Sequence, residues 1–220
     1  MIALGVLLSG NGSNFQAIID AIAAGELDAR VAVVVSNVAS ARGLDRARAA
    51  GIPAIVVDHR GFASRADFDA HVAKLLVARG AEYVVLAGFM RVVTGALLGA
   101  FPMRVINIHP SLLPAFPGID AQSQAFAYGA RIAGCTVHFV DEGTDTGPVI
   151  AQCAVGVLAS DDDASLRARI LHEEHKLLTR ALQWLSEGRV TVEPRDPPRR
   201  ARVTVAGAQT FSFAATPQNT

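Results

Sequence analysis

The sequence predicts an α/β fold with a mainly parallel central sheet, and two patterns in the 220-residue chain support this prediction. Apolar runs of strand length, at residues 2–8, 31–36 and 83–87, alternate with segments whose apolar residues recur at helical spacing. Such alternation is typical of strand–helix–strand units, which build parallel sheets covered by helices. In the second half, the short polar loop 141–148 joins two apolar runs at 135–140 and 149–157, so an antiparallel strand pair is expected there.

The first predicted helix follows the strand at 2–8. Ser13 and Gln16 have the spacing of a capping box, which predicts the start of this helix. Its apolar stripe consists of Phe15, Ile18, Ile19 and Ile22. A further helix is predicted from about Ser64 to Gly80, because glycine suits a helix end. The inward-facing residues of that helix are expected to be Phe68, Val72, Leu75 and Leu76.

Two more helices are predicted in the second half, near residues 122–128 and from about 165 to 186. An acidic turn at 161–163 precedes the long helix, and we interpret it as a solvated cap rather than a metal site. From Arg189 onward the sequence is rich in Pro and Arg and then weakly strand-like. We therefore predict one domain at residues 1–188 and a C-terminal appendage at 189–220 of unknown role.

The composition argues against several classes of function. The 20 Lys and Arg residues balance the 20 Asp and Glu residues, so no nucleic-acid-binding surface is expected. No run reaches the roughly 18 to 20 apolar residues of a membrane helix, and no cleavable leader is recognisable before the first strand. Cys135 and Cys153 lack a neighbouring Cys or His at ligand spacing, which argues against disulfides and zinc. We expect a soluble, unprocessed, cytoplasmic protein without a metal ion or a membrane partner.

The most informative segment is the apolar run at 105–109, which ends at Pro110. Asn107 and His109 are two residues apart, so in an extended strand both side chains leave the same face. An amide and a titratable base together at a strand end suit a reaction with an oxyanion-forming step. A single histidine at a strand end can also be purely structural, and this segment alone leaves both interpretations open.

The loop at residues 9–14 lies between an apolar strand and the first helix. Backbone N–H groups and the helix dipole at such a point can bind a phosphate. The loop fits neither the dinucleotide-binding fingerprint nor a Walker loop. A tight turn that needs glycine for steric reasons explains the loop equally well.

A second polar loop, residues 141–148, contains three carboxylates, two glycines and a proline. Loop carboxylates are usually only solvated. Asp145 lies between glycines and close to two apolar strands, so the loop could also carry it against a histidine and raise the pKa of that imidazole.

Glu174 stands out because the apolar residues of the long helix place it on the buried face. These residues are Leu166, Ile170, Leu177, Leu178, Ala181, Leu182 and Leu185. A lone buried charge is costly, so Glu174 either reaches water over the edge or binds a polar group such as a sugar hydroxyl.

A buried strand runs into residues 88–93, where Phe89 and Met90 are followed by Arg91. Phe89 and Met90 are most simply core residues. An apolar wall that ends in a cation also suits a flat heterocycle carrying a carboxylate.

These motifs, in unbroken order, make the chain resemble the phosphoribosylglycinamide formyltransferase family of folate-dependent purine synthesis. The resemblance runs from Ile2 to about Gly188 and includes the segments 9–14, 86–91, 107–114 and 141–148. It implies a Rossmann-like three-layer sandwich and makes residues 1–188 a formyltransferase domain.

The resemblance also implies roles for individual residues. The catalytic residues are expected to be Asn107, His109 and Asp145. Glycinamide ribonucleotide is expected to contact Gly12, Ser13 and Asn14 through its phosphate, Glu174 through its ribose, and also Asn107 and Pro110. The pocket for 10-formyltetrahydrofolate is expected to be lined by Arg65, Met90, Arg91, Val92, Val93, Asn107, Asp141, Glu142, Gly143, Thr144 and Asp145.

In the implied reaction, the amine of the ribonucleotide attacks the formyl carbon of the folate, and the formyl oxygen becomes anionic. Asn107 and protonated His109 are expected to stabilise this oxyanion. Asp145 is expected to keep His109 charged and to help move a proton from the amine to the departing folate nitrogen. The formylfolate is a co-substrate, no metal is needed, and the protein is expected to be a monomer or a homodimer that binds small molecules.

The chain departs from the family pattern at Gln122, where many relatives carry a histidine. Three alternative functions have different expected features. A formyltetrahydrofolate hydrolase is expected to have a regulatory N-terminal domain and to lack the first loop, and a methionyl-tRNA formyltransferase is expected to add a basic RNA-binding domain. A non-catalytic nucleotide-binding module needs none of Asn107, His109 and Asp145 together.

Overall fold

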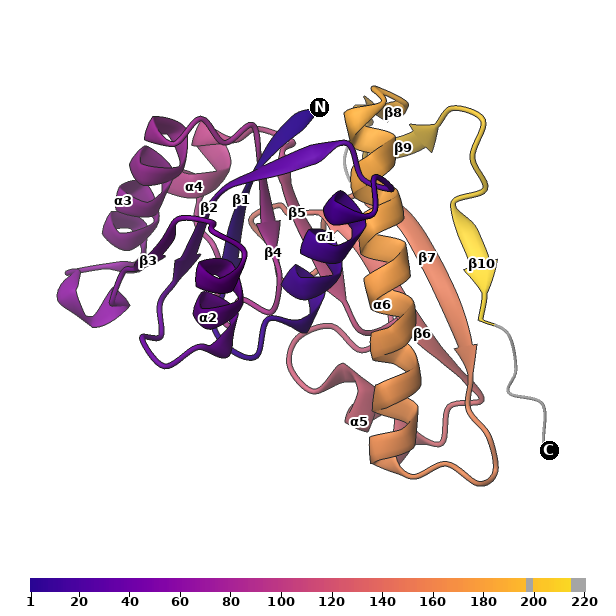
Figure 1. Cartoon of the computed structure of the whole chain (residues 1–220). Helices are drawn as coiled ribbons and strands as arrows, with labels where there is room; N and C mark the ends of the chain where they lie inside the picture. Colours follow the sequence, from indigo (N-terminus) through magenta and orange to yellow (C-terminus); the bar gives the residue numbers. More distant parts are fainter. Residues whose placement is uncertain (197–199, 215–220) are drawn as a thin grey trace.

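The computed structural model describes residues 1–196 and 200–214. Within these ranges, eight strands form a central sheet in the order β10-β7-β6-β5-β4-β1-β2-β3 (Figure 1). The strands of the first half are β1 (Ile2–Leu8), β2 (Ala29–Ser36), β3 (Ala54–Val56), β4 (Tyr83–Leu86) and β5 (Val105–His109). They are followed by β6 (Ile132–Phe139), β7 (Val149–Gly156), β8 (Val190–Glu193), β9 (Arg202–Val205) and β10 (Phe211–Phe213).

The helices are α1 (Ser13–Ala23), α2 (Arg42–Ala49), α3 (Arg65–Ala78), α4 (Gly95–Ala100), α5 (Ala121–Tyr128) and α6 (Asp163–Ser186), with a 3₁₀ turn at His59–Gly61. Strands β1 to β5 pair in parallel, whereas β6 runs antiparallel to both β5 and β7. The predicted α/β class, the mainly parallel sheet and the antiparallel pair in the second half are therefore confirmed.

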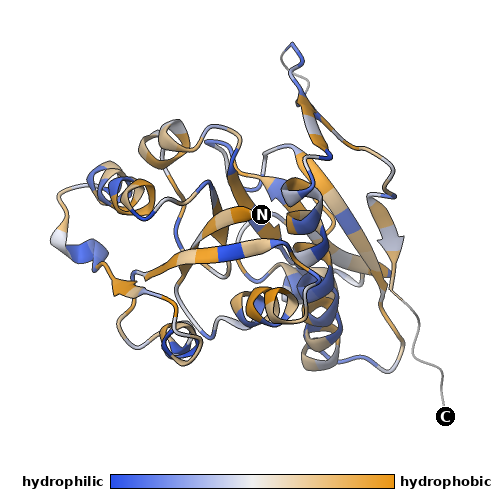
Figure 2. Ribbon diagram, turned by 45° about the horizontal axis from the view of Figure 1, so that its top comes forward, coloured by the Kyte–Doolittle hydropathy of each residue, from blue (hydrophilic) through white to orange (hydrophobic). Residues whose placement is uncertain are grey.

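Helices cover both faces of the sheet and make a three-layer sandwich (Figure 1). The alternation of β1 shows how one strand serves two cores, since Leu4 and Val6 pack on the side of α1 and α6 while Leu7 packs on the side of α3 and α4. Gly5 fits this pattern because a Cβ there would lie 2.6 Å from Leu76 Cδ2 of α3. Figure 2 shows that the central strands are mostly hydrophobic, whereas hydrophilic residues concentrate on the outer helices.

The predicted start of α1 is wrong in detail. The helix is capped by the backbone of Gly12, and no side chain provides a capping hydrogen bond. Ser13 is already the first helical residue, and Gln16 turns outward to Asp20 and Arg46 instead of reaching back. The predicted start of α3 is confirmed, because the Ser64 hydroxyl accepts from the N–H of Asp67.

The acidic turn before α6 is a cap, as predicted. Asp162 and Ser165 form a reciprocal capping box. The prediction that this turn is solvated is wrong for Asp161, whose side chain is enclosed by an ion pair with Arg169 and accepts from the N–H of Leu158. These hydrogen bonds lower the pKa of Asp161 to about 2.

The C-terminal segment contributes to two sheets. Strands β8 and β9 form an antiparallel pair of their own, and β10 then adds in parallel to the free edge of β7 (Figure 1). Helix α6 ends at Ser186, just before the predicted boundary at residue 188. The division into a domain and an appendage stays a prediction.

Cys135 and Cys153 are register partners on β6 and β7, and both thiols are free. Burial raises the pKa of both thiols, so neither is an activated nucleophile. Among the described residues, no helix combines the length and the hydropathy needed to cross a bilayer.

Candidate active site

Asn107 and His109 lie on β5, between the parallel strand β4 and the antiparallel strand β6. Their neighbours in register on β6 are His138 and Thr136. Asn107 is partly exposed, whereas only 4% of His109 is accessible. Asn107 and His109 share one face of β5 because side chains alternate along a strand. The flanking Ile106 and Ile108 therefore lie on the other face, in a hydrophobic core.

Asp145 brings the two residues into one cluster. Its Oδ2 lies 3.3 Å from His109 Nδ1, and its Oδ1 accepts a long 3.5 Å hydrogen bond from Asn107 Nδ2. Asp145 has a positive φ of 54°, a conformation that Asp tolerates better than most residues. The N–H of Gly118 donates to Oδ2 at 2.7 Å and so fixes the carboxylate from the other side.

The loop that carries Asp145 is held by its own side chains. Asp141 accepts hydrogen bonds from the N–H of Gly143 and from the hydroxyl of Thr146. Gly147 is required for steric reasons, because a Cβ there would lie 1.8 Å from the carbonyl oxygen of Phe139. The loop is thus shaped so that Asp145 folds back over β5 and β6.

Both ring nitrogens of His109 face oxygen atoms. Nε2 lies 2.9 Å from the carbonyl oxygen of Phe116, and Nδ1 faces Asp145. A neutral imidazole has only one N–H, so the charged ring alone satisfies both contacts. Burial nevertheless lowers the pKa of His109, and the Phe116 carbonyl and Asp145 offset this only in part. Asp145 does raise the pKa of the imidazole, as the sequence predicts, but burial outweighs this contribution, so charged His109 is a better proton donor than a free imidazolium.

The pKa of Asp145 is lowered, whereas burial usually raises the pKa of a carboxylate. Burial alone would raise its pKa, but the nearby His138 ring, the hydrogen bond from the N–H of Gly118 and the His109 imidazole together lower it. The carboxylate is therefore ionised at neutral pH.

His138 is a member of this cluster that the sequence analysis missed. It is 1% exposed, its Nε2 lies 3.2 Å from Asn107 Nδ2 and 3.7 Å from Asp145 Oδ1, and its Nδ1 lies 2.9 Å from the carbonyl oxygen of Phe139. The available signal was a lone imidazole in the apolar run 135–140. Its meaning depends on the register with β5, which the sequence does not specify.

The loop at 9–14 leads from β1 into α1. Gly12 has a φ of 72°, and a Cβ there would lie 2.7 Å from Gly43 Cα of α2, so the steric interpretation of this glycine holds. Arg46 of α2, which the sequence analysis also missed, donates to the Asn11 carbonyl, the Asn11 side chain and Gln16.

Glu174 is buried on the α6 stripe, as expected, and accepts a 2.9 Å hydrogen bond from Asn14 Nδ2. Burial raises the pKa of Glu174, and the Asn14 hydrogen bond offsets this only in part. Asn14 Oδ1 is itself buried and has no partner among the described residues. A carboxylate and an unpaired amide oxygen therefore lie together between α1 and α6, ready to accept hydrogen bonds.

The segment after β4 shows two environments. Met90 and Val92 are exposed, at 72% and 46%, whereas Val93 is buried in the core beside α3 and α4. Arg91 lies 4.9 Å from the Phe68 ring centroid, and its buried Nε has no hydrogen-bond partner in the described chain. The backbone N–H of Met90 donates to Ser9 Oγ, which ties this segment to the first loop.

The remaining predicted residues have these positions. Pro110 and Asp141 are partly buried, Arg65 is exposed at the start of α3, and Glu142, Gly143 and Thr144 are exposed on the Asp145 loop. Gln122 is partly buried in the first turn of α5. The structure does not bring Arg65 into any hydrogen bond or ion pair that it describes.

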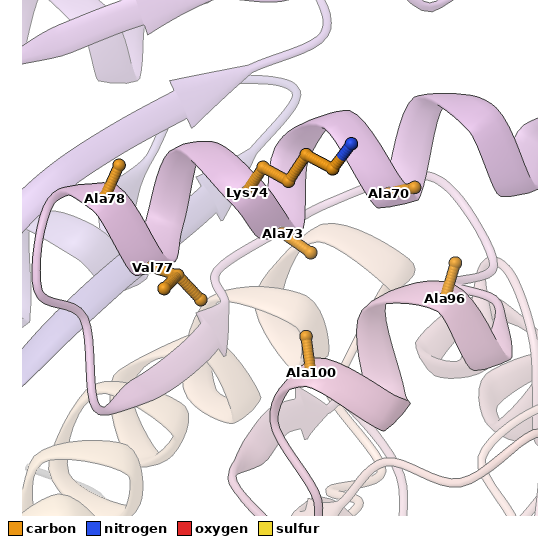
Figure 3. A pocket seen from close by; sticks show the side chains of 7 residues that line it. All are labelled: Ala70, Ala73, Lys74, Val77, Ala78, Ala96 and Ala100. Carbon is orange, nitrogen blue, oxygen red and sulfur yellow. The ribbon is translucent and has the colours of Figure 1, made fainter.

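A shallow groove of about 440 Å³ lies elsewhere, between α3 and α4 (Figure 3). Its walls consist of five alanines, Val77 and Lys74. The lysine amine has no second polar side chain in that lining to work with, so the groove offers no reaction comparable with that of the Asn107, His109 and Asp145 cluster.

Comparison with known proteins gives consistent matches. The formyl transferase family model matches residues 3–182. The chain is 44% identical to phosphoribosylglycinamide formyltransferase of Bacillus subtilis (strain 168), over 78% of this chain and 88% of that protein. It is 47% identical to the trifunctional purine biosynthetic protein adenosine-3 of Drosophila melanogaster, over 86% of this chain but only 14% of that much longer protein. The crystal structure of glycinamide ribonucleotide transformylase 1 from Symbiobacterium toebii superposes with a TM-score of 0.88 at 51% identity, covering 93% of this chain and 94% of that one.

Proposed function

The chain belongs to the formyl transferase family, and from this premise we propose that it transfers a formyl group from 10-formyltetrahydrofolate to the amino group of 5'-phosphoribosylglycinamide. This is a step of de novo purine biosynthesis, and the formylfolate is a co-substrate. The observation that carries the proposal is the cluster in which Asp145 links Asn107 and His109 at the end of β5.

The residues of this cluster can carry out the steps of the transfer. The amine attacks the formyl carbon, and the formyl oxygen takes up negative charge. When this oxygen forms the carbonyl again, the bond between the formyl carbon and the folate nitrogen breaks, and that nitrogen takes up a proton. Asn107 and charged His109 stabilise that charge, and the lowered pKa of His109 makes its imidazolium a strong proton donor toward the oxygen or the departing folate nitrogen. Asp145, ionised by its N–H and imidazole neighbours, supplies the opposite charge and accepts a proton from the amine, directly or through water. No step needs a metal ion.

The acceptor substrate is proposed to bind along the first loop and α6. The N-terminus of α1 and the N–H groups of Gly12, Ser13 and Asn14 hold the phosphate. Glu174 and the unpaired Asn14 Oδ1 accept hydrogen bonds from the ribose hydroxyls. Asn107 and Pro110 contact the glycinamide end.

The folate is proposed to bind against the segment after β4 and the Asp145 loop. The exposed Met90 and Val92 provide apolar surface, and the buried, unpaired Nε of Arg91 provides a donor for a folate oxygen or carboxylate. Because the Val93 side chain is buried in the core, this residue contacts the folate through its backbone. The other contacts are assigned to Arg65, Asn107, Asp141, Glu142, Gly143, Thr144 and Asp145.

A cytoplasmic location and small-molecule partners are parts of the same proposal, and so is a monomer or a homodimer. The two free thiols support a reducing compartment.

The function is tested by following folate absorbance in a mixture of the protein and 10-formyltetrahydrofolate, with and without the ribonucleotide. Loss of the formyl group only when the ribonucleotide is present supports transfer. Loss of the formyl group without the ribonucleotide indicates a hydrolase. If the absorbance changes in neither mixture, both enzymatic activities are contradicted and a binding module is favoured.

A further inference from the structure

His138 is buried in the cluster around Asp145 and takes no part in the bond making or the proton transfers of the reaction proposed above. It stands directly opposite Asn107 in the antiparallel register of β5 and β6. Three groups face its ring: the carbonyl of Phe139, the amide of Asn107 and the carboxylate of Asp145. These contacts determine where its proton lies.

The tautomer of His138 follows from the acceptor at Nδ1. The carbonyl oxygen of Phe139 lies 2.9 Å from Nδ1 and can only accept, so Nδ1 carries a hydrogen. In the neutral ring, Nε2 then has a lone pair and no hydrogen. Asn107 Nδ2 lies 3.2 Å from Nε2, which is the distance of an N–H that donates to this lone pair.

This hydrogen bond sets the polarity of the Asn107 amide. One amide hydrogen points to His138, and the second points to Asp145 Oδ1 at 3.5 Å. Both hydrogens are then engaged within the protein, and the end of the amide that stays free is the oxygen Oδ1. An amide oxygen accepts from the attacking amine, but it cannot donate to the formyl oxygen.

The polarity reverses if His138 gains a proton. Nε2 then becomes a donor, it repels the amide hydrogens, and it attracts Oδ1 instead. Rotation of the Asn107 side chain by half a turn about its last bond satisfies this contact and directs Nδ2 toward the formyl oxygen.

We propose that His138 is a positioning residue that sets which end of the Asn107 amide faces the substrates. Neutral His138 holds Asn107 as a hydrogen-bond acceptor for the incoming amine, and charged His138 holds it as a donor to the oxyanion. The proposal rests on formyl transfer as the reaction, and it assigns His138 an effect that is exerted through Asn107.

The first test is spectroscopic and needs no substrate. In ¹⁵N-histidine NMR of the free protein at neutral pH, the ring resonances that disappear in His138→Gln belong to this residue. They are expected to report one protonated nitrogen, Nδ1, and one bare nitrogen, Nε2. A ring with its single proton on Nε2, or a doubly protonated ring, overturns the assigned orientation of Asn107.

The second test is kinetic and compares two replacements. The glutamine side chain in His138→Gln can offer either an amide oxygen or an amide nitrogen near the position of Nε2, so this variant is expected to keep kcat within about tenfold of the wild type. His138→Met fills the space without a polar hydrogen-bonding group, and kcat is expected to fall on the order of 10² to 10³-fold while both KM values change little. His71→Met, at an exposed position on α3, is the matched control and is expected to leave kcat unchanged.

The outcomes separate the two proposals. Equal losses of kcat in His138→Gln and His138→Met, or a wild-type kcat in His138→Met, overturn the positioning role. If the wild-type protein does not transfer formyl at all, the proposed function fails, and the NMR spectrum still decides the contact between His138 and Asn107. If His138→Met does not fold, the Gln variant and the spectrum remain decisive.

Discussion

Two carboxylates, the partly buried Asp145 and the buried Glu174, lie in different regions of the molecule, and their pKa values are shifted in opposite directions. The Asp145 side chain is 12% exposed and sits among Gly118, His109 and His138, and its pKa is lowered. Glu174 is 4% exposed on the apolar stripe of α6, receives the Asn14 amide, and its pKa is raised. Burial raises the pKa of both groups, so the donors and positive charges around each carboxylate decide the outcome.

The two regions are therefore suited to different tasks. The Asp145 region keeps a charge that can act on the reacting atoms. The Glu174 region keeps unused acceptor capacity, which a ligand with hydroxyl groups would satisfy. The following predictions, from the largest expected effect to the smallest, test this difference.

Replacing Asp145 by Asn is expected to lower kcat on the order of 10² to 10⁴-fold, because the charge beside His109 and the proton acceptor are both lost. The variant should also be less stable at neutral pH. A carboxylate with a lowered folded pKa stabilises the protein above its unfolded pKa, and this contribution disappears as the pH falls through the folded pKa. Steady-state rates and thermal unfolding at neutral and acidic pH measure both effects. A wild-type kcat would remove Asp145 from the mechanism.

Replacing Glu174 by Gln is expected to give the opposite stability effect. A carboxyl with a raised folded pKa favours folding below its unfolded pKa, and this advantage is lost as the pH rises through the folded pKa. The neutral amide of the variant avoids that loss, so Tm should exceed the wild-type value at neutral pH, and the gain should vanish in acid. The KM for the ribonucleotide should rise about tenfold, since a charged acceptor is lost, with the KM for the folate unchanged. An unchanged ribonucleotide KM would return Glu174 to a structural role.

Replacing Arg46 by Gln is expected to raise the ribonucleotide KM about fivefold by loosening the loop at residues 9–14, which Arg46 holds at Asn11 and Gln16. The exposed Arg48 of the same helix pairs with Asp45, and Arg48→Gln serves as the matched control with little expected effect. Equal KM values in the two variants would show that α2 does not position the loop through Arg46.

Replacing Asp162 by Ala is expected to leave both KM values and kcat unchanged, because this carboxylate only caps α6. Loss of the cap should lower Tm by about 2–4 °C. Rates and thermal unfolding together check the prediction. A fall in kcat would mean that the start of α6 affects the geometry of the active site.

The sequence by itself determined much of this architecture. Apolar runs of strand length identified the strands at 2–8 and 149–157, and a period of 3.6 residues identified the stripe of α6, since these patterns depend on local geometry and on burial. The spacing of Asn107 and His109 and the position of Glu174 on the apolar stripe could be derived in the same way. The capping box at Ser13 failed because the packing of α2 against Gly12 sets the start of α1, and packing is not a local property.

Only the tertiary structure decided how the cluster around Asp145 is assembled. The register of β5 against β6 places His138 opposite Asn107, and a one-residue shift would turn His138 to the other face. The direction of the net pKa shift of His109 likewise could not be predicted from the sequence. It depends on how deeply the ring is buried against the pull of Asp145 and the Phe116 carbonyl, and these opposing contributions exist only once the chain has folded.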